Sequence, residues 1–156
     1  MYQHQEINNP YISLHDCRAG KMNYEKGTLS FLFADGFWVL PDHPENQSED
    51  LVRTNSSQVD FRMIDEEIEV VQIYVFKENR SGKVIREEWE LENFIHAVND
   101  GSFEVEFITK YDGYQSFLFQ CWVWFDCEPY HYECEIILRA ENITYCWDSL
   151  NDKRVW

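Results

Sequence analysis

Basic residues are scarce in this chain. Lys and Arg total 13 among 156 residues, against 29 Asp and Glu, so the formal net charge is −16. The few basic side chains are scattered, which argues against the clustered cationic surface that nucleic-acid-binding proteins need. A surface this negative also repels anionic membranes and favours basic partners. We therefore expect neither nucleic acid nor membrane as a partner.

Long apolar runs and targeting signals are missing as well. The longest apolar run, residues 117–125, is much shorter than a membrane span and indicates a buried strand. Residues 1–6 have neither the basic nor the apolar region of a secretory signal peptide. The sequence therefore predicts a cytoplasmic protein.

The common catalytic and cofactor motifs are absent too. There is no glycine-rich phosphate loop, no HExxH zinc motif and no GxSxG nucleophile motif. We expect a protein that is not an enzyme and that holds no cofactor and no metal ion.

The chain does contain enough apolar residues to form a hydrophobic core. It is 44% hydrophobic and 17% aromatic, unlike a disordered acidic tail. Its length suits one compact domain, residues 1–156.

The dominant sequence pattern has a period of two, which is typical of strands with one buried face. Asp35-Gly36 and Asp112-Gly113 each lie between apolar runs and predict hairpins. A polar stretch, 41–56, predicts a long surface loop. The expected strands are 11–17, 21–25, 29–33, 37–40, 58–63, 68–76, 84–86, 103–107, 114–125, 130–139 and 143–147.

One segment has helical periodicity instead. Leu91, Phe94, Ile95 and Val98 follow i, i+3, i+4, i+7 spacing, and acidic residues crowd the start of the segment. We predict one helix near 88–99. Tight turns make neighbouring strands antiparallel, and the last four strands should form a meander. The predicted fold is mainly β: an antiparallel, bent sheet, either an open barrel or a sandwich, with that single helix packed on one face.

Two groups of residues invite a catalytic or metal-binding interpretation. His15-Asp16-Cys17 resembles a nucleophile with its base, but alternation on a strand would turn Asp16 away from the other two. Cys121, Cys127, His131 and Cys134 lie close in sequence, but their spacing differs from that of structural zinc sites. The five cysteines, the fifth being Cys146, are better explained as reduced core residues.

The candidate binding residues are carboxylates and two tryptophans. Glu104 with Glu106 and Glu133 with Glu135 point outward from their predicted strands and would form an acidic sheet face. Trp122 and Trp124 share one strand face and could anchor an interface. The predicted surface loop adds Asp42, Glu45, Glu49 and Asp50.

Several short segments together resemble an uncharacterised family of small acidic bacterial proteins, over nearly the whole chain. That family implies no activity and no functional residue. In size and charge the chain is also similar to immunity proteins of bacterial toxin systems. The segments are His15-Asp16-Cys17, Leu29-Ser30-Phe31, Asp35-Gly36-Phe37-Trp38, Glu87-Glu88-Trp89-Glu90-Leu91 and Tyr130-His131-Tyr132-Glu133-Cys134.

The leading hypothesis is a non-enzymatic acidic protein that binds a basic protein, as an immunity protein binds a basic toxin. One alternative is a small-ligand-binding or enzymatic half-barrel that uses His15 and His131. The other is a structural domain without a strong partner.

Overall fold

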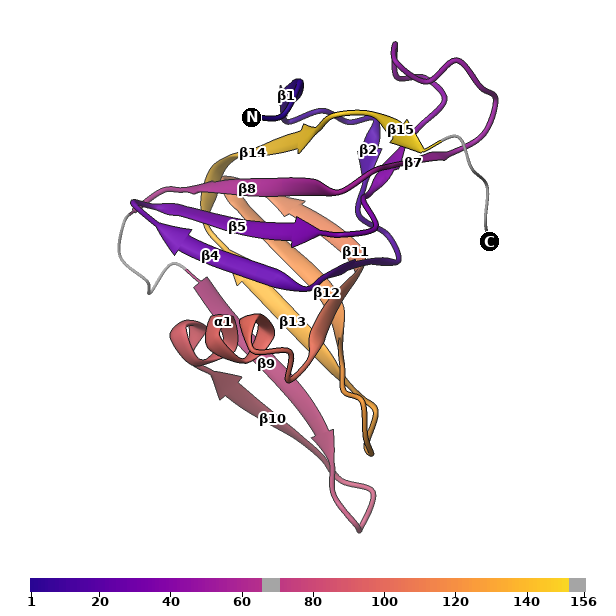
Figure 1. The fold of residues 1–156 in the computed structure, drawn as a ribbon. Coiled ribbons are helices and arrows are strands. Elements are labelled where there is room, and N and C mark those ends of the chain that lie inside the picture. The colour runs from indigo at the N-terminus through magenta and orange to yellow at the C-terminus, as the bar shows by residue number, and fades with distance from the viewer. Residues whose placement is uncertain (66–70, 152–156) are drawn as a thin grey trace.

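The computed structural model describes residues 1–65 and 71–151, and in these the fold is mainly β (Figure 1). Within these residues the strands form three antiparallel sheets with one short helix and no closed barrel, which confirms the predicted mainly β class. The largest sheet has six strands, in the order β10 (Val84–Trp89), β9 (Val71–Glu78), β13 (His131–Leu138), β12 (Ser116–Trp124), β11 (Glu104–Gly113) and β3 (Cys17–Ala19).

Two smaller sheets complete the fold. The five-stranded sheet has the order β1 (His4–Ile7), β14 (Ala140–Trp147), β8 (Ser57–Met63), β5 (Thr28–Phe33) and β4 (Lys21–Glu25). The four-stranded sheet has the order β15 (Leu150–Asn151), β7 (Val52–Thr54), β6 (Trp38–Val39) and β2 (Ile12–Ser13).

The hydrophobic core lies between the two larger sheets. Phe31 and Phe61 of the five-stranded sheet meet Phe107 and Phe119 of the six-stranded sheet, and all four are buried. The ring centroids are 5.0 Å apart for Phe31–Phe107 and 5.5 Å for Phe61–Phe119, both edge-to-face. Such pairs add to the burial of apolar area, so this cluster holds the sheets together.

The helix α1 (Leu91–Asn99) starts three residues later than predicted. Leu91, Phe94 and Val98 are its buried side, as the spacing indicates. Glu87 and Glu88, expected at the helix start, belong instead to β10, where they pair with β9. Strand pairing across the sheet overrides the local helical signal there.

Asn99 fastens the end of α1 to the edge strand β4. Its side-chain amide accepts from Met22 N at 2.8 Å and donates to Met22 O at 2.9 Å. Lys21 Nζ also donates to Asn99 O. The helix therefore covers part of the open side between the two larger sheets, as Figure 1 shows.

The two Asp-Gly pairs have different outcomes. β11 and β12 do form the expected hairpin, but its two-residue turn is Tyr114-Gln115, with Gly113 still paired to Ser116. The hairpin predicted at Asp35-Gly36 is wrong. β5 and β6 belong to different sheets, and the turn carries the chain from one to the other.

Three further predictions need correction. The expected strand 11–17 is two short strands, β2 and β3, because Asp16 has a φ of 60° that breaks the extended backbone. The meander holds only for β11, β12 and β13, since the chain turns at Arg139 and β14 joins β8 in the other sheet through a bulge. The predicted loop 41–56 contains β7.

β1, which the sequence did not indicate, is an edge strand paired with β14. Of the strand expected at 68–76, residues 68–70 lie outside the described residues, and β9 covers the rest. No helix in the described part of the chain is long and apolar enough to cross a membrane.

Candidate functional site

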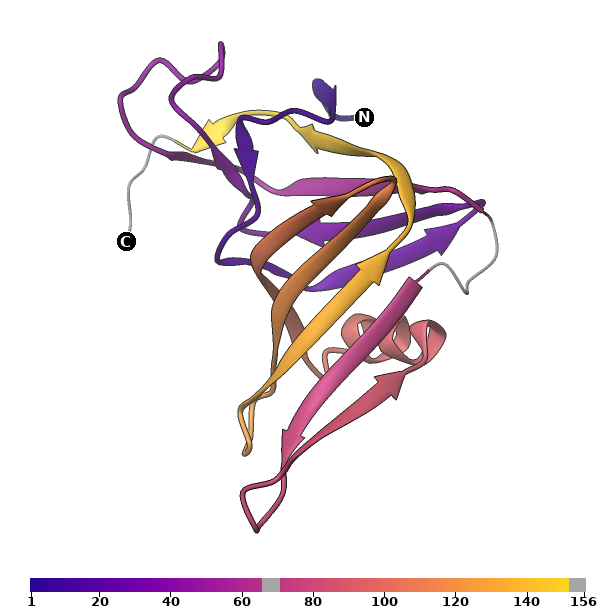
Figure 2. The same cartoon turned by 180° about the vertical axis from the view of Figure 1, so that it is seen from behind.

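Six of the ten candidate residues lie together on the outer face of the six-stranded sheet. Alternation places them there, since their neighbours Val105, Cys121, Val123 and Cys134 are buried on the inner face. In Figure 2, where the molecule is seen from behind, no other described element crosses this outer face. The six are Glu104, Glu106, Trp122, Trp124, Glu133 and Glu135.

The register of the strands lines these residues up in rows. In the longest row each residue is directly opposite the next, so one line of side chains crosses all six strands. Directly opposed side chains are close enough to interact, at about 4.5–5.5 Å between Cβ atoms. The row is Arg18, Glu106, Trp122, Glu133, Phe76 and Arg86.

Contacts within this face hold its aromatic rings in place. Arg18 Nε is 3.1 Å from Glu106 Oε2, and the Arg18 guanidinium lies 4.6 Å from the centre of the Trp124 ring. The His131 ring sits between the tryptophans, 4.7 Å from Trp122 and 4.8 Å from Trp124. The tryptophans are half-buried, so their side chains are already restricted and lose little conformational entropy when a partner binds.

The face is mixed in character but negative overall. Tyr74, Phe76, Trp122 and Trp124 are half-buried on it. The guanidiniums of Arg18 and Arg86 lie over aromatic rings, Trp124 and Tyr74 respectively. Carboxylates outnumber these cations. They are Glu88, Glu104, Glu106, Glu133 and Glu135.

The four loop carboxylates are in a separate place. Asp42, Glu45, Glu49 and Asp50 are exposed in the loop between β6 and β7. This loop lies at the end of the molecule away from the β9–β10 hairpin (Figure 1). The structure therefore does not unite them with the sheet carboxylates.

That loop is anchored by a buried histidine that the sequence did not single out. His43 is 3% exposed, and its Nε2 lies 2.8 Å from Glu6 Oε2. Its Nδ1 accepts from Glu45 N, so Nε2 carries the proton that it donates to Glu6. Loops carry no periodic pattern, so nothing in the sequence marks His43 as buried.

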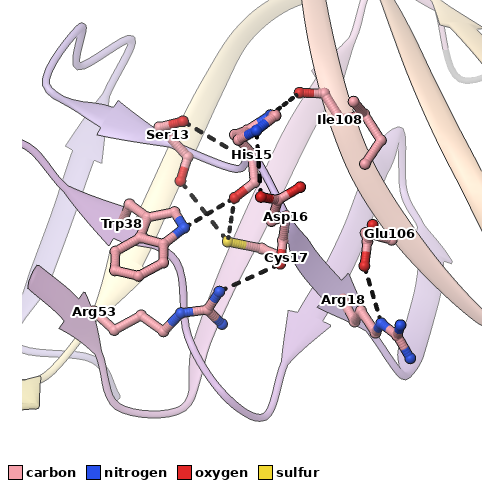
Figure 3. Close-up of polar contacts among 9 residues, drawn as sticks. All are labelled: Ser13, His15, Asp16, Cys17, Arg18, Trp38, Arg53, Glu106 and Ile108. Carbon is pink, nitrogen blue, oxygen red and sulfur yellow. Dashed lines mark hydrogen bonds and ion pairs between the residues drawn. The ribbon is translucent and has the colours of Figure 1, made fainter. Parts of the chain in front are cut away.

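His15, Asp16 and Cys17 are held in a network of local hydrogen bonds (Figure 3). His15 lies outside a strand, so its ring reaches both Asp16, at 3.3 Å between Nε2 and Oδ2, and Ile108 O, at 2.7 Å from Nδ1. The expectation that Asp16 points away from its neighbours is therefore wrong for His15. The Cys17 thiol points at the backbone oxygens of Ser13 and His15.

This arrangement does not activate the thiol. Burial raises the pKa of Cys17 to about 12, so the nucleophilic thiolate is a minor species at neutral pH. A cavity of about 100 Å³ lies beside His15, lined by Leu14, Phe107, Phe119 and others. His131 is not among its lining residues in the described chain, so the two histidines do not share this cavity.

The cysteines lie mostly in the core. Cys121 and Cys134 are buried opposite each other on the inner face of the six-stranded sheet, whereas His131 is exposed on the outer face. Burial raises the pKa of both thiols. Cys127 is exposed, which corrects the expectation that all five cysteines are core residues. Within residues 1–65 and 71–151, no three His, Cys, Asp or Glu side chains are grouped to hold a metal ion.

This placement predicts how the thiols react. In the native protein, one thiol per chain, Cys127, should react rapidly with a thiol reagent, because the other four are buried. Denaturation without reductant should release all five. The measurement is thiol titration, and Cys127→Ser is the control that should abolish the fast reaction. Fewer than five thiols in the denatured wild type would show that a disulfide is present.

Comparisons with protein-family models, with curated proteins and with solved structures give no match. The function has to be inferred from the geometry of this chain.

Proposed function

We propose that this protein is a non-enzymatic binding protein, and that its outer face on the six-stranded sheet docks a basic protein, specifically a toxin that it neutralises. The observation that carries the proposal is the gathering of four glutamates and two tryptophans on one uncovered sheet face. Carboxylates with rigid aromatic rings suit a cationic protein surface, because the rings supply contact area and the charges supply orientation.

The size of the face fits this role. β9, β12 and β13 are eight or nine residues long and lie side by side within six strands. Strand spacing and rise per residue then give about 25 Å in each direction, or roughly 600 Å² in projection. A standard interface buries about 800 Å² of accessible surface on each partner, so this face with its rim is large enough.

The net charge of −16 supports the same partner class. Toxins that attack nucleic acid need a basic surface, and an acidic inhibitor gains fast, electrostatically steered association with them. This supports an immunity protein over a structural domain, which has no need of an uncovered acidic face.

The test is co-expression with the product of the neighbouring gene, with growth and association rate as readouts. We expect that product to be toxic alone and harmless with the wild-type protein. Glu133→Lys/Glu135→Lys should lower the association rate about 10-fold or more at about 0.05 M salt, and by much less at about 0.5 M, where charges are screened. Circular dichroism checks that the variant is folded.

The matched control is Asp42→Lys/Glu45→Lys, which changes the net charge equally but lies in the loop between β6 and β7. It should lower the association rate by no more than about 3-fold, because it alters only the long-range field. Equal effects of the two variants would contradict the sheet face as the docking site. A neighbouring product that is neither toxic nor bound would overturn the immunity function.

A further inference from the structure

Trp122 has an acidic residue directly opposite it on each side. Glu106 of β11 and Glu133 of β13 are its register partners on the outer face. Opposed side chains on a sheet are neighbours, so the indole ring stands between two carboxylates. We call these three residues, Glu106, Trp122 and Glu133, the Trp122 site.

The same face already binds an arginine of this chain. The Arg18 guanidinium lies over Trp124 at 4.6 Å from the ring centre while its Nε contacts Glu106 Oε2 at 3.1 Å. The Arg86 guanidinium also lies over an aromatic ring, 3.6 Å from the centre of Tyr74. The spacing of strands and rings on this face therefore suits a guanidinium that stacks on an aromatic ring and pairs with a carboxylate.

Among the described residues, Trp122 differs from Trp124 and Tyr74 in having no such cation. In the described chain a Lys or Arg lies over Trp38, Tyr74, Trp89 and Trp124, but none over Trp122, whose ring meets the His131 ring at a steep angle of 78°. One oxygen of Glu133 accepts from Gln120 Nε2 at 2.9 Å, which fixes that carboxylate beside the ring. Arg18 fixes Glu106 on the other side.

We infer that the Trp122 site binds an arginine side chain of the partner. This rests on the proposed function and names the group that the outer face recognises. A guanidinium is planar, weakly hydrated and able to pair with a carboxylate through two N–H groups while it stacks. A lysine ammonium has the same charge but cannot stack as a plane or form that paired contact, so the site discriminates arginine from lysine.

The experiment compares two synthetic peptides, alternating arginine and glycine or alternating lysine and glycine, of equal length and charge. Calorimetric titration at low salt gives the ratio of their dissociation constants. We expect the arginine peptide to bind the wild type about 5- to 10-fold more tightly. In Trp122→Leu the ratio should fall to about one, while binding of both peptides remains salt-dependent.

The control is Tyr114→Leu, which removes an exposed aromatic ring from the turn between β11 and β12, away from the Trp122 site. It should keep the preference for arginine. Should Trp122→Leu lose its fold, Glu133→Gln tests the site instead and should lower the ratio. A wild-type ratio near one, or a ratio unchanged by these variants, would overturn the arginine site and leave the proposed function intact. Failure of both peptides to bind the wild type would count against both.

Discussion

Replacing Gly36 by alanine is expected to destabilise the fold by at least about 4 kcal/mol, at the extreme of single substitutions. Gly36 has a φ of 76° and is buried in the turn between β5 and β6. An added Cβ would lie 2.1 Å from Thr54 O, 2.4 Å from Thr54 Oγ1 and 2.7 Å from Asn55 O. Thr54 cannot move away, because it also bonds Phe37 through its hydroxyl and its N–H.

Gly101→Ala separates the two causes of this loss. Gly101 has a φ of 84°, but an added Cβ there would meet nothing within 4 Å. It should cost only about 1 to 2 kcal/mol, the penalty of a left-handed backbone alone. Urea unfolding of both variants measures the difference. Equal losses of stability in the two variants would show that Thr54 shifts and makes room for the added Cβ.

Replacing Phe107 by alanine should cost about 3 to 5 kcal/mol, the range for removing a buried phenylalanine ring. Phe107 is 1% exposed and contacts Phe31, Phe33 and Phe119 at centroid distances of 5.0, 5.6 and 5.2 Å. It therefore touches both larger sheets, and its loss leaves a cavity where they meet.

The matched control is Tyr111→Ala, on the same strand but 55% exposed. Its effect should stay within about 0.5 kcal/mol. Chemical unfolding of the two variants gives both values. A loss below about 1 kcal/mol for Phe107→Ala would mean that the core repacks around the vacancy.

Local patterns in the sequence predicted local structure well. Alternation around Val59 and Phe61 and around Cys134 identified strands and their buried sides, because one face of each strand packs on the core. The same alternation placed Glu133 and Glu135 on the outer face. The helical spacing of Leu91, Phe94 and Val98 identified the only helix of the described residues.

Partners distant in the sequence could not be predicted in this way. Asp35-Gly36 specifies a change of direction, but which sheet β6 joins depends on its contacts with β2 and β7. In the same way Glu87 and Glu88 are strand residues because β9 pairs with them.

For the same reason, the sequence predicted only part of the candidate site. Its carboxylates and tryptophans follow from alternation, whereas Arg18 enters the face because β3 pairs with β11 far along the chain. In the sequence Arg18 lies between two small apolar residues, Cys17 and Ala19. This short alternation was the one local signal that the Arg18 side chain points outward.

The place of β14 has a consequence for how the protein is made. β14 lies between β1 and β8, and its Trp147 pairs with His4. During synthesis, β1 and β8 therefore leave the ribosome long before β14, the strand that joins them. Completion of the six-stranded sheet is delayed as well, because β3 cannot pair until β11 has been synthesised. Pairings this distant slow folding, and the nascent chain exposes apolar residues such as Phe31 of β5 until Phe107 of β11, which packs on it, has been synthesised. The nascent chain is thus a candidate client for chaperones, and its folding is a late, cooperative event that follows synthesis of β14.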